Sequence, residues 1–348
     1  MSDEETPFDL IARLPKAELH CHGWAALDPA ILALIRDQGH EIPITPEALA
    51  ALTPARTFSE FTAWHQALKP LRRNFGALKI LIEAHVQRLR AQNVAYAEIM
   101  LGTSPLDRGD PPLPDDTSVM VDKMRQLREL ANSVGAGQTS VEFTIGLTSR
   151  ASLELTEKWI RPLIEMYRAG VIVGITWVGL DEGGPVAPLA PVFVGLKEAG
   201  LPFEIHAGEF DGPRRVREAI EEGFADRIGH GIATFQDQYL LDLIKERQIH
   251  LELCPTSNVR TGVVPSIEEH PLRRALELGL NFSINSDDPG TFACSVESEY
   301  RLAADIFGFS EADLLQVTAN AMGSRFRRQT ERRGSEAAFD PVPGRRLP

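Results

Sequence analysis

The sequence predicts an α/β fold, the (β/α)8 or TIM barrel, in which eight parallel strands form a closed sheet surrounded by helices. Eight segments of β-like composition alternate with segments of helical periodicity along most of the 348 residues. Such alternation indicates a parallel sheet, and a barrel of eight units accommodates this length as one domain. An open, doubly wound sheet is the alternative, but no predicted strand is followed by its Gly-x-Gly-x-x-Gly motif.

The predicted strands are short segments rich in β-branched and aromatic residues. Residues 141–147 alternate as a strand does, and residues 171–177 form a β-branched run typical of a strand buried on both faces. We place the eight strands at residues 17–22, 94–100, 141–147, 171–177, 202–206, 226–230, 249–254 and 281–288.

The intervals between these strands contain the predicted helices. The first follows Asp28-Pro29, because an aspartate caps free N–H groups and a proline fits the first helical turn. Residues 103–118 are rich in Pro, Asp and Gly and are expected to form a loop. We place helices at residues 30–38, 53–71, 76–92, 118–135, 152–169, 188–199, 213–222, 236–247 and 269–278.

The helix at residues 53–71 has a second interpretation. Phe58, Phe61, Trp64 and Leu68 recur at spacings of three and four, which indicates an amphipathic helix. Most such apolar stripes belong to the core, but this one comes soon after the first strand. It is therefore either core or a helical lid inserted over a site, and the pattern alone leaves both open.

Composition limits the possible partners. The net charge of −13 argues against nucleic acid and against an anionic membrane surface, because both need clustered Lys and Arg. No apolar run reaches the roughly 18 residues of a membrane span, and the acidic N-terminus lacks the apolar segment of a signal peptide. The three cysteines form no close pair. We expect a cytoplasmic protein that acts on a small molecule; its oligomeric state is not determined.

The domain organisation has one expected boundary. Residues 1–326 are expected to form the single barrel domain, and residues 327–348 carry six Arg against three acidic residues with little apolar content. We predict that these last residues form a disordered basic tail. Binding to an acidic partner is the alternative for such a basic segment.

Two histidines stand at the end of the first predicted strand. His20 and His22 are two residues apart, so on a strand they project to the same face. Neutral imidazole is the commonest protein ligand for a transition metal. Taken alone, an isolated His-x-His is more often a structural or surface pair than a metal site.

Other polar residues end other predicted strands. His206 ends the fifth strand, His230 ends the sixth, and Asp287 and Asp288 end the eighth. The C-terminal ends of barrel strands meet at one mouth, where active sites form. Histidines and a carboxylate there predict a site for a borderline metal, with zinc the first candidate, and such a metal lowers the pKa of a bound water.

The acidic residues near these positions each have a functional and a structural interpretation. Glu209 comes three residues after His206 and is placed to transfer protons in the same cavity. A helix N-terminal carboxylate is its structural alternative. Asp287-Asp288-Pro289 is also a common turn and helix cap. Because histidines end the neighbouring strands, we favour the functional interpretation of these acidic residues over the structural one.

Five motifs give the chain a family resemblance. They resemble the adenosine deaminase family of the amidohydrolase barrels, stand in the family's order and extend from about residue 11 to 325. The motifs are Leu14-Pro15-Lys16-Ala17-Glu18-Leu19-His20-Cys21-His22, His206-Ala207-Gly208-Glu209, Arg227-Ile228-Gly229-His230-Gly231, Cys254-Pro255-Thr256-Ser257-Asn258 and Ser286-Asp287-Asp288-Pro289.

The resemblance implies a zinc-dependent deamination of a 6-aminopurine. It implies that one zinc ion is held by His20, His22, His206 and Asp287. It also implies that Glu209 protonates a ring nitrogen, while His230 and Asp288 orient the water and handle its proton. The implied substrate contacts are the backbone of Gly179 to the base, and Phe58 and Phe61 in a hydrophobic lid.

The resemblance has departures on the sugar side. Adenosine deaminases usually carry an acid two places after the second histidine, where it binds the ribose 5′-hydroxyl, but Trp24 stands there. Indole offers only a donor, so it cannot accept that hydrogen bond. The segment from Glu98 to Leu101 also lacks the arginine common at that strand end. Trp24 then forms a wall for an altered substrate, unless a nearby acid such as Asp28 replaces the missing one.

Three functions are therefore compared. The first is a zinc-dependent deaminase of an adenosine-like nucleoside or an adenine derivative. The second is a metal-dependent amidohydrolase acting on a different aminated heterocycle or C–N bond, such as a 6-amino-6-deoxyfutalosine deaminase. The third is a non-catalytic ligand-binding relative, which intact Glu209, His230 and Asp288 argue against.

Overall fold

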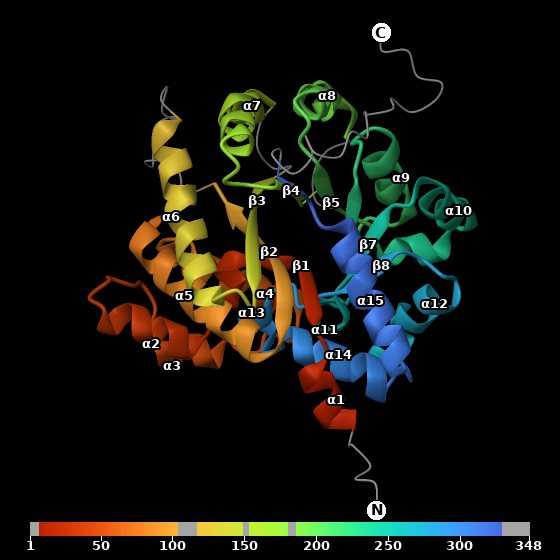
Figure 1. Ribbon diagram of the computed structural model, residues 1–348, viewed down its shortest axis with the longest axis horizontal. Helices are drawn as coiled ribbons and strands as arrows, with labels where there is room; N and C mark the ends of the chain where they lie inside the picture. Colours follow the sequence, from red (N-terminus) through yellow and green to blue (C-terminus); the bar gives the residue numbers. More distant parts are fainter. Residues whose placement is uncertain (1–6, 104–116, 149–152, 180–185, 329–348) are drawn as a thin grey trace, which may run out of the picture.

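The structure is a computed structural model that describes residues 7–103, 117–148, 153–179 and 186–328. Eight parallel strands pair in sequence order into one sheet, which confirms the predicted (β/α)8 barrel. Helices surround the strands, with α6 on one side and α10 on the other (Figure 1). The strands are β1 Lys16–His22, β2 Val94–Gly102, β3 Ser140–Thr148, β4 Gly174–Val178, β5 Phe203–Ala207, β6 Arg227–His230, β7 His250–Leu253 and β8 Phe282–Ile284.

The barrel closes between β8 and β1. Cys21 and Asp287 form a parallel bridge, in which the N–H of His22 donates to the Asp287 carbonyl at 2.9 Å. The N–H of Asp287 donates in turn to the His20 carbonyl at 3.0 Å. The closure therefore holds the end of β1 directly against the segment that carries Asp287.

Two predicted strands extend at least three residues beyond the observed ones. The predicted strand 281–288 ends at Ile284, because Asp287 adopts a left-handed backbone with φ 59°, which a strand does not allow. The predicted strand 171–177 begins only at Gly174, after a turn at Gly170 with φ +67°. Both differences lie at strand ends, where sequence patterns are least informative.

The helices match the expected alternation. The helix predicted at residues 53–71 is shorter in the structure. It begins only at Phe58, because the Thr57 side chain caps α4 by accepting from the Glu60 N–H at 3.2 Å. The helices are α1 Pro7–Arg13, α2 Pro29–Asp37, α3 Pro46–Ala51, α4 Phe58–Leu68, α5 Phe75–Ala91, α6 Ser118–Gly135, α7 Leu153–Arg168, α8 Ala190–Glu198, α9 Pro213–Glu221, α10 Gln238–Arg247, α11 Pro255–Arg260, α12 Leu272–Glu277, α13 Pro289–Phe292, α14 Val296–Asp305 and α15 Glu311–Ser324.

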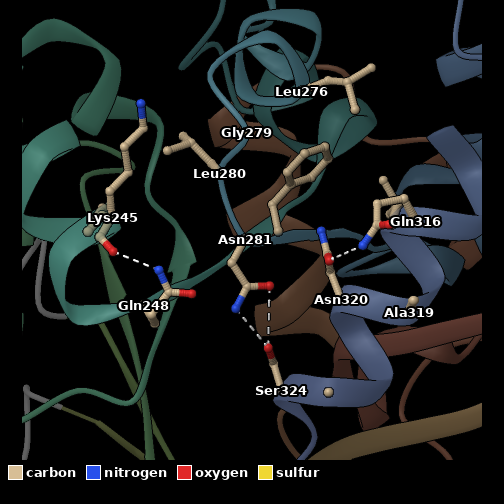
Figure 2. A pocket seen from close by; sticks show the side chains of 14 residues that line it. Lys245, Gln248, Leu276, Gly279, Leu280, Asn281, Gln316, Ala319, Asn320 and Ser324 are labelled. Atoms are coloured by element: carbon tan, nitrogen blue, oxygen red, sulfur yellow. Dashed lines mark hydrogen bonds between the residues drawn. The ribbon is translucent and has the colours of Figure 1, made fainter.

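A groove of about 630 Å³ lies at the N-terminal end of the barrel, between α10, α12 and α15. Polar side chains that line it hydrogen-bond one another: Asn281 donates to Ser324 Oγ at 3.1 Å, and Gln316 donates to Asn320 at 2.9 Å (Figure 2). This groove is remote from the C-terminal ends of the strands, where the sequence predicts the site.

Two further expectations concern the C-terminal tail and the absence of a membrane span. The predicted basic tail lies outside the described residues from residue 329 onward. Within the part of the chain that the structure describes, none of the helices combines the length and apolar character that crossing a membrane requires.

Candidate active site

Four side chains from three strand ends converge at the C-terminal mouth of the barrel. The Nε2 atoms of His22 and His206 lie 3.2 Å apart. The Oδ1 atom of Asp287 lies 3.1 Å from His22 Nε2 and 3.4 Å from His20 Nε2. The three histidines form one group of possible metal-ligating atoms. Asp287 Oδ1 adjoins two of them, so the four side chains predicted as metal ligands lie together.

This cluster fits a divalent metal ion. Among the described residues, His20 Nε2 and Asp287 Oδ1 are buried without a hydrogen-bond partner. Buried polar atoms are rarely left unpaired, so two unpaired atoms facing the same volume fit the binding of a cation. Imidazole nitrogens with one carboxylate are also the ligand set of catalytic zinc sites.

One buried glutamate hydrogen-bonds His20 from behind, and a second lies close to the His206 ring. His20 Nδ1 hydrogen-bonds Glu252 Oε2 at 2.7 Å, and His206 Nδ1 lies 3.0 Å from Glu204 Oε1. A carboxylate acceptor keeps the proton on Nδ1 and leaves the Nε2 lone pair for a metal. Burial lowers the pKa of His206 well below its usual range, which favours the neutral ring that coordination requires.

The strand ends that carry the site have unusual backbones. His230 and Asp287 both adopt φ 59°, the left-handed region that residues with a side chain rarely occupy. Such conformations persist only where the surrounding structure enforces them, and they cluster at functional sites. For Asp287 the enforcement comes from backbone hydrogen bonds to β1 and from Ser257, whose Oγ donates to Oδ2 at 2.6 Å.

A second group lies beside the histidine cluster. The His230 ring is 4.8 Å from the His20 ring, and its Nδ1 accepts from Asn258 Nδ2 at 3.1 Å. Its Nε2 therefore carries the proton, and this atom lies 3.6 Å from Glu209 Oε2. Burial lowers the pKa of His230 well below its usual range, which favours the neutral ring.

Two carboxylates near the cluster also had structural alternatives in the sequence. Glu209 lies in the connection between β5 and α9, four residues before Pro213, and its carboxylate faces His230. Asp288 occupies the N-cap position of α13, but its side chain makes no capping hydrogen bond. Its Oδ2 lies instead 3.9 Å from His65 Nε2 on α4.

Helix α4 packs beside the mouth of the barrel. The Phe61 ring stacks on Phe292 with centroids 5.6 Å apart, and the Phe58 ring lies 5.1 Å from Phe210. Phe210 directly follows Glu209. The same helix buries Trp64, so it contributes to the core and also borders the site, and neither sequence alternative describes it alone.

The remaining predicted substrate residues lie on the same side of the barrel. Gly179 follows the end of β4 with φ +76°. Trp24 lies just after β1, is buried, and has an Nε1 without a partner among the described residues. Asp28, the candidate replacement acid, is already engaged: it caps α2 through Ile31 N–H at 2.9 Å and pairs with Arg88 at 2.8 Å.

Sequence reasoning missed the residues that support the site. Glu204 and Glu252 lie inside strands. The one indication that they point inward was their position two residues before His206 and Cys254, which places each pair on the same face of its strand. Ser257 and Asn258 belong to a motif that was noticed without a role for each residue. His65 carried no signal, because a histidine on an amphipathic helix is ordinary.

Histidines and a carboxylate gathered at the C-terminal mouth of a (β/α)8 barrel define a hydrolase of the metal-centred amidohydrolase class. The chain belongs to the adenosine deaminase family, whose model, described as adenosine deaminase, matches residues 15–337. It is thus an enzyme that hydrolyses C–N bonds in cyclic amidines. The predicted family resemblance is confirmed.

Individual relatives differ in their named substrates. An aminodeoxyfutalosine deaminase of Streptomyces coelicolor is 31% identical over 350 residues, covering 99% of this chain and 85% of that protein. An adenine deaminase of Caulobacter vibrioides is 31% identical over 346 residues, covering 95% of each. A solved zinc-bound amidohydrolase of Burkholderia ambifaria has a TM-score of 0.78 at 24% identity, covering 97% of this chain and 93% of that chain.

Proposed function

We propose that the protein is a zinc-dependent hydrolytic deaminase that releases ammonia from a 6-aminopurine compound. The observation that carries this proposal is the convergence of His20, His22, His206 and Asp287 beside the Glu209–His230 pair. One zinc ion per chain, when bound by the four ligands, would supply a water whose pKa is lowered towards neutrality.

The proton chemistry is assigned to residues outside the ligand set. Glu209 is proposed to protonate the ring nitrogen next to the amino-bearing carbon, which makes that carbon electrophilic. His230, whose Nε2–H faces Glu209, orients the attacking water with Asp288. Asp288 is buried with Oδ1 unpaired among the described residues, so it retains an acceptor for a proton or a substrate N–H.

The substrate is proposed to lack the usual interaction with a ribose 5′-hydroxyl. Trp24 offers no acceptor there, and Asp28 is held by α2 and Arg88. Adenine or an adenine nucleoside altered at the 5′ position fits such a site. The names of the relatives, adenine deaminase and aminodeoxyfutalosine deaminase, support a substrate other than adenosine.

Adenosine is expected to be a poor substrate. A site built around a hydroxyl contact can lose several powers of ten in kcat/KM without it, and at least a tenfold deficit relative to the best compound is expected here. The test measures ammonia release by the zinc-loaded protein from adenosine, adenine and 5′-modified adenosines. Adenosine turned over as efficiently as the best compound would show that Trp24 does not alter specificity.

The same panel separates the competing functions. Release of ammonia from none of the purines, with metal bound, would favour a different aminated heterocycle as substrate. Binding of purines without any turnover would favour the non-catalytic relative.

Helix α4 is proposed to act as a lid, which predicts an effect of Phe61→Ala on substrate affinity. Loss of the aromatic stack on Phe292 is expected to raise KM by about fivefold, since such pairs contribute roughly 1 kcal/mol beyond their buried area. Metal content should not change, because Phe61 is not in the ligand cluster. Leu34→Ala, an exposed change on α2, is the control. An unchanged KM in Phe61→Ala would assign α4 to the core only.

A further inference from the structure

Arg227 connects the N-terminal end of the barrel to the proposed metal ligand His20. The guanidinium is buried at the start of β6, where its Nη2 donates to Glu98 Oε2 at 2.6 Å. Its Nε pairs with Glu252 Oε1 at 2.6 Å. The other Glu252 oxygen hydrogen-bonds His20 Nδ1 at 2.7 Å, so a single carboxylate separates the guanidinium from the ligand.

The C-terminal end of α15 and the residues after it cover this guanidinium. The Phe326 ring stacks over Arg227, with the guanidinium carbon 3.6 Å from the ring centroid. The Ser324 carbonyl accepts from Arg227 Nη1 at 3.2 Å, and the Phe326 N–H donates to Glu98 Oε1 at 2.7 Å. Residues 324–326 therefore contact both members of the Arg227–Glu98 ion pair.

The barrel provides a place for the Phe326 ring. A Cβ atom at Gly174, the first residue of β4, would lie 2.5 Å from a Phe326 ring carbon, so only glycine leaves room for the ring. Phe326 itself is buried. The seat for this side chain is thus built from a strand more than a hundred residues away in the sequence.

The Phe326 ring covers a buried guanidinium that neutralises two carboxylates. Glu98 and Glu252 are buried carboxylates that both depend on Arg227, and breaking one partner of a buried ion pair costs several kcal/mol. A face-on aromatic ring excludes water from the guanidinium and attracts its positive charge. Removal of the ring would let water compete for Arg227 and loosen the hold on Glu252.

We propose that residues 324–326 are a positioning element for the metal ligand His20, acting through Arg227 and Glu252 from the opposite end of the barrel. Phe326 holds Arg227, Arg227 holds one oxygen of Glu252, and the other oxygen of Glu252 orients the His20 ring. The inference rests on the proposed metal centre. It assigns a role in metal affinity to a segment that does not touch the centre.

Phe326→Ala tests this role through metal affinity rather than turnover. Carboxylates behind metal ligands typically contribute 10- to 100-fold to affinity, so the zinc Kd is expected to rise by about tenfold, measured by competition with a chromophoric chelator. The rise in Tm caused by zinc should shrink as well, because the stabilisation depends on [Zn]/Kd. Phe326→Leu keeps apolar bulk but not the ring face, and it should fall between Phe326→Ala and the natural protein.

Two truncations provide the matched comparison. A chain ending after Arg328 keeps the whole element, including the Arg328–Glu142 contact at 3.4 Å, and should bind zinc as the full chain does. A chain ending after Gly323 should bind zinc at least as weakly as Phe326→Ala. If that truncation does not fold, the point variants decide the question.

The outcomes separate this inference from the proposed metal centre. A full-length chain that binds zinc tightly, with an unchanged Kd in Phe326→Ala and an equal loss of Tm with and without zinc, would overturn the inference alone. Such a result would make the segment purely structural. A full-length chain that binds no divalent metal would overturn the metal centre and the inference together.

Discussion

His20→Ala and Asp287→Ala are expected to lose the bound metal and, with it, all detectable deamination. Each change removes one of four ligand atoms that lie within a few ångströms of one another. The full chain should purify with about one zinc or similar ion, because the four ligand atoms form a single cluster. Metal analysis after exhaustive dialysis, together with ammonia release on the purine panel, measures both effects.

A buried histidine outside the cluster provides the control. His250 lies on β7, where it bonds Asn281 and Ser283 at 2.9 Å each. His250→Asn tests whether loss of any buried imidazole weakens the protein enough to release metal, and it should retain the ion. Full metal content in both His20→Ala and Asp287→Ala would refute the ligand assignment.

Glu209→Gln is expected to keep the metal and to lower kcat by roughly 100-fold or more, the usual contribution of a general acid–base residue. Glutamine preserves the shape of the side chain but cannot donate and recover a proton at that position. Glu209 is not among the four ligand atoms, so metal content should equal that of the natural protein. Steady-state kinetics on the best substrate, with metal analysis in parallel, separates the two quantities.

The neighbouring acid supplies a comparison from the same loop. Asp211 pairs with Arg215 at 3.2 Å and has no contact with the histidine cluster. Asp211→Asn should leave kcat within a few-fold of the natural value. Turnover by Glu209→Gln close to that of Asp211→Asn would show that Glu209 does not transfer the proton.

The fold was predictable because the chain repeats one local pattern eight times. Several strands are long enough to show β-branched or alternating residues, and the longer helices show their own period. The errors lie where tertiary contacts override the pattern. At Asp287, hydrogen bonds to β1 enforce a left-handed backbone, and the strand predicted there ends three residues earlier.

The principal site residues were predictable for a geometric reason. His20, His22, His206, His230 and the Asp287–Asp288 pair all stand at predicted strand ends, and a barrel brings such ends to one mouth. Position in the sequence was thus enough to predict that they meet. The chemistry assigned to each residue stays a proposal until the variants above are measured.

Helix α4 shows where the pattern reaches its limit. Its apolar spacing is the same for a core helix and for a lid, and the structure shows features of both: Trp64 is buried, while Phe61 and His65 lie beside Phe292 and Asp288. The spacing of apolar residues indicates that one face of the helix is buried. It does not indicate whether the core or a bound substrate buries that face.

The sequence by itself determined the order of strands and helices and which polar residues end the strands, because both depend on neighbours along the chain. Only the tertiary structure decided which side chains support them. The partner of His20 is Glu252, 232 residues away, and the ring that covers Arg227 belongs to Phe326. Such pairs depend on how distant segments pack in three dimensions. Local periodicity and spacing in one sequence carry no information about that packing.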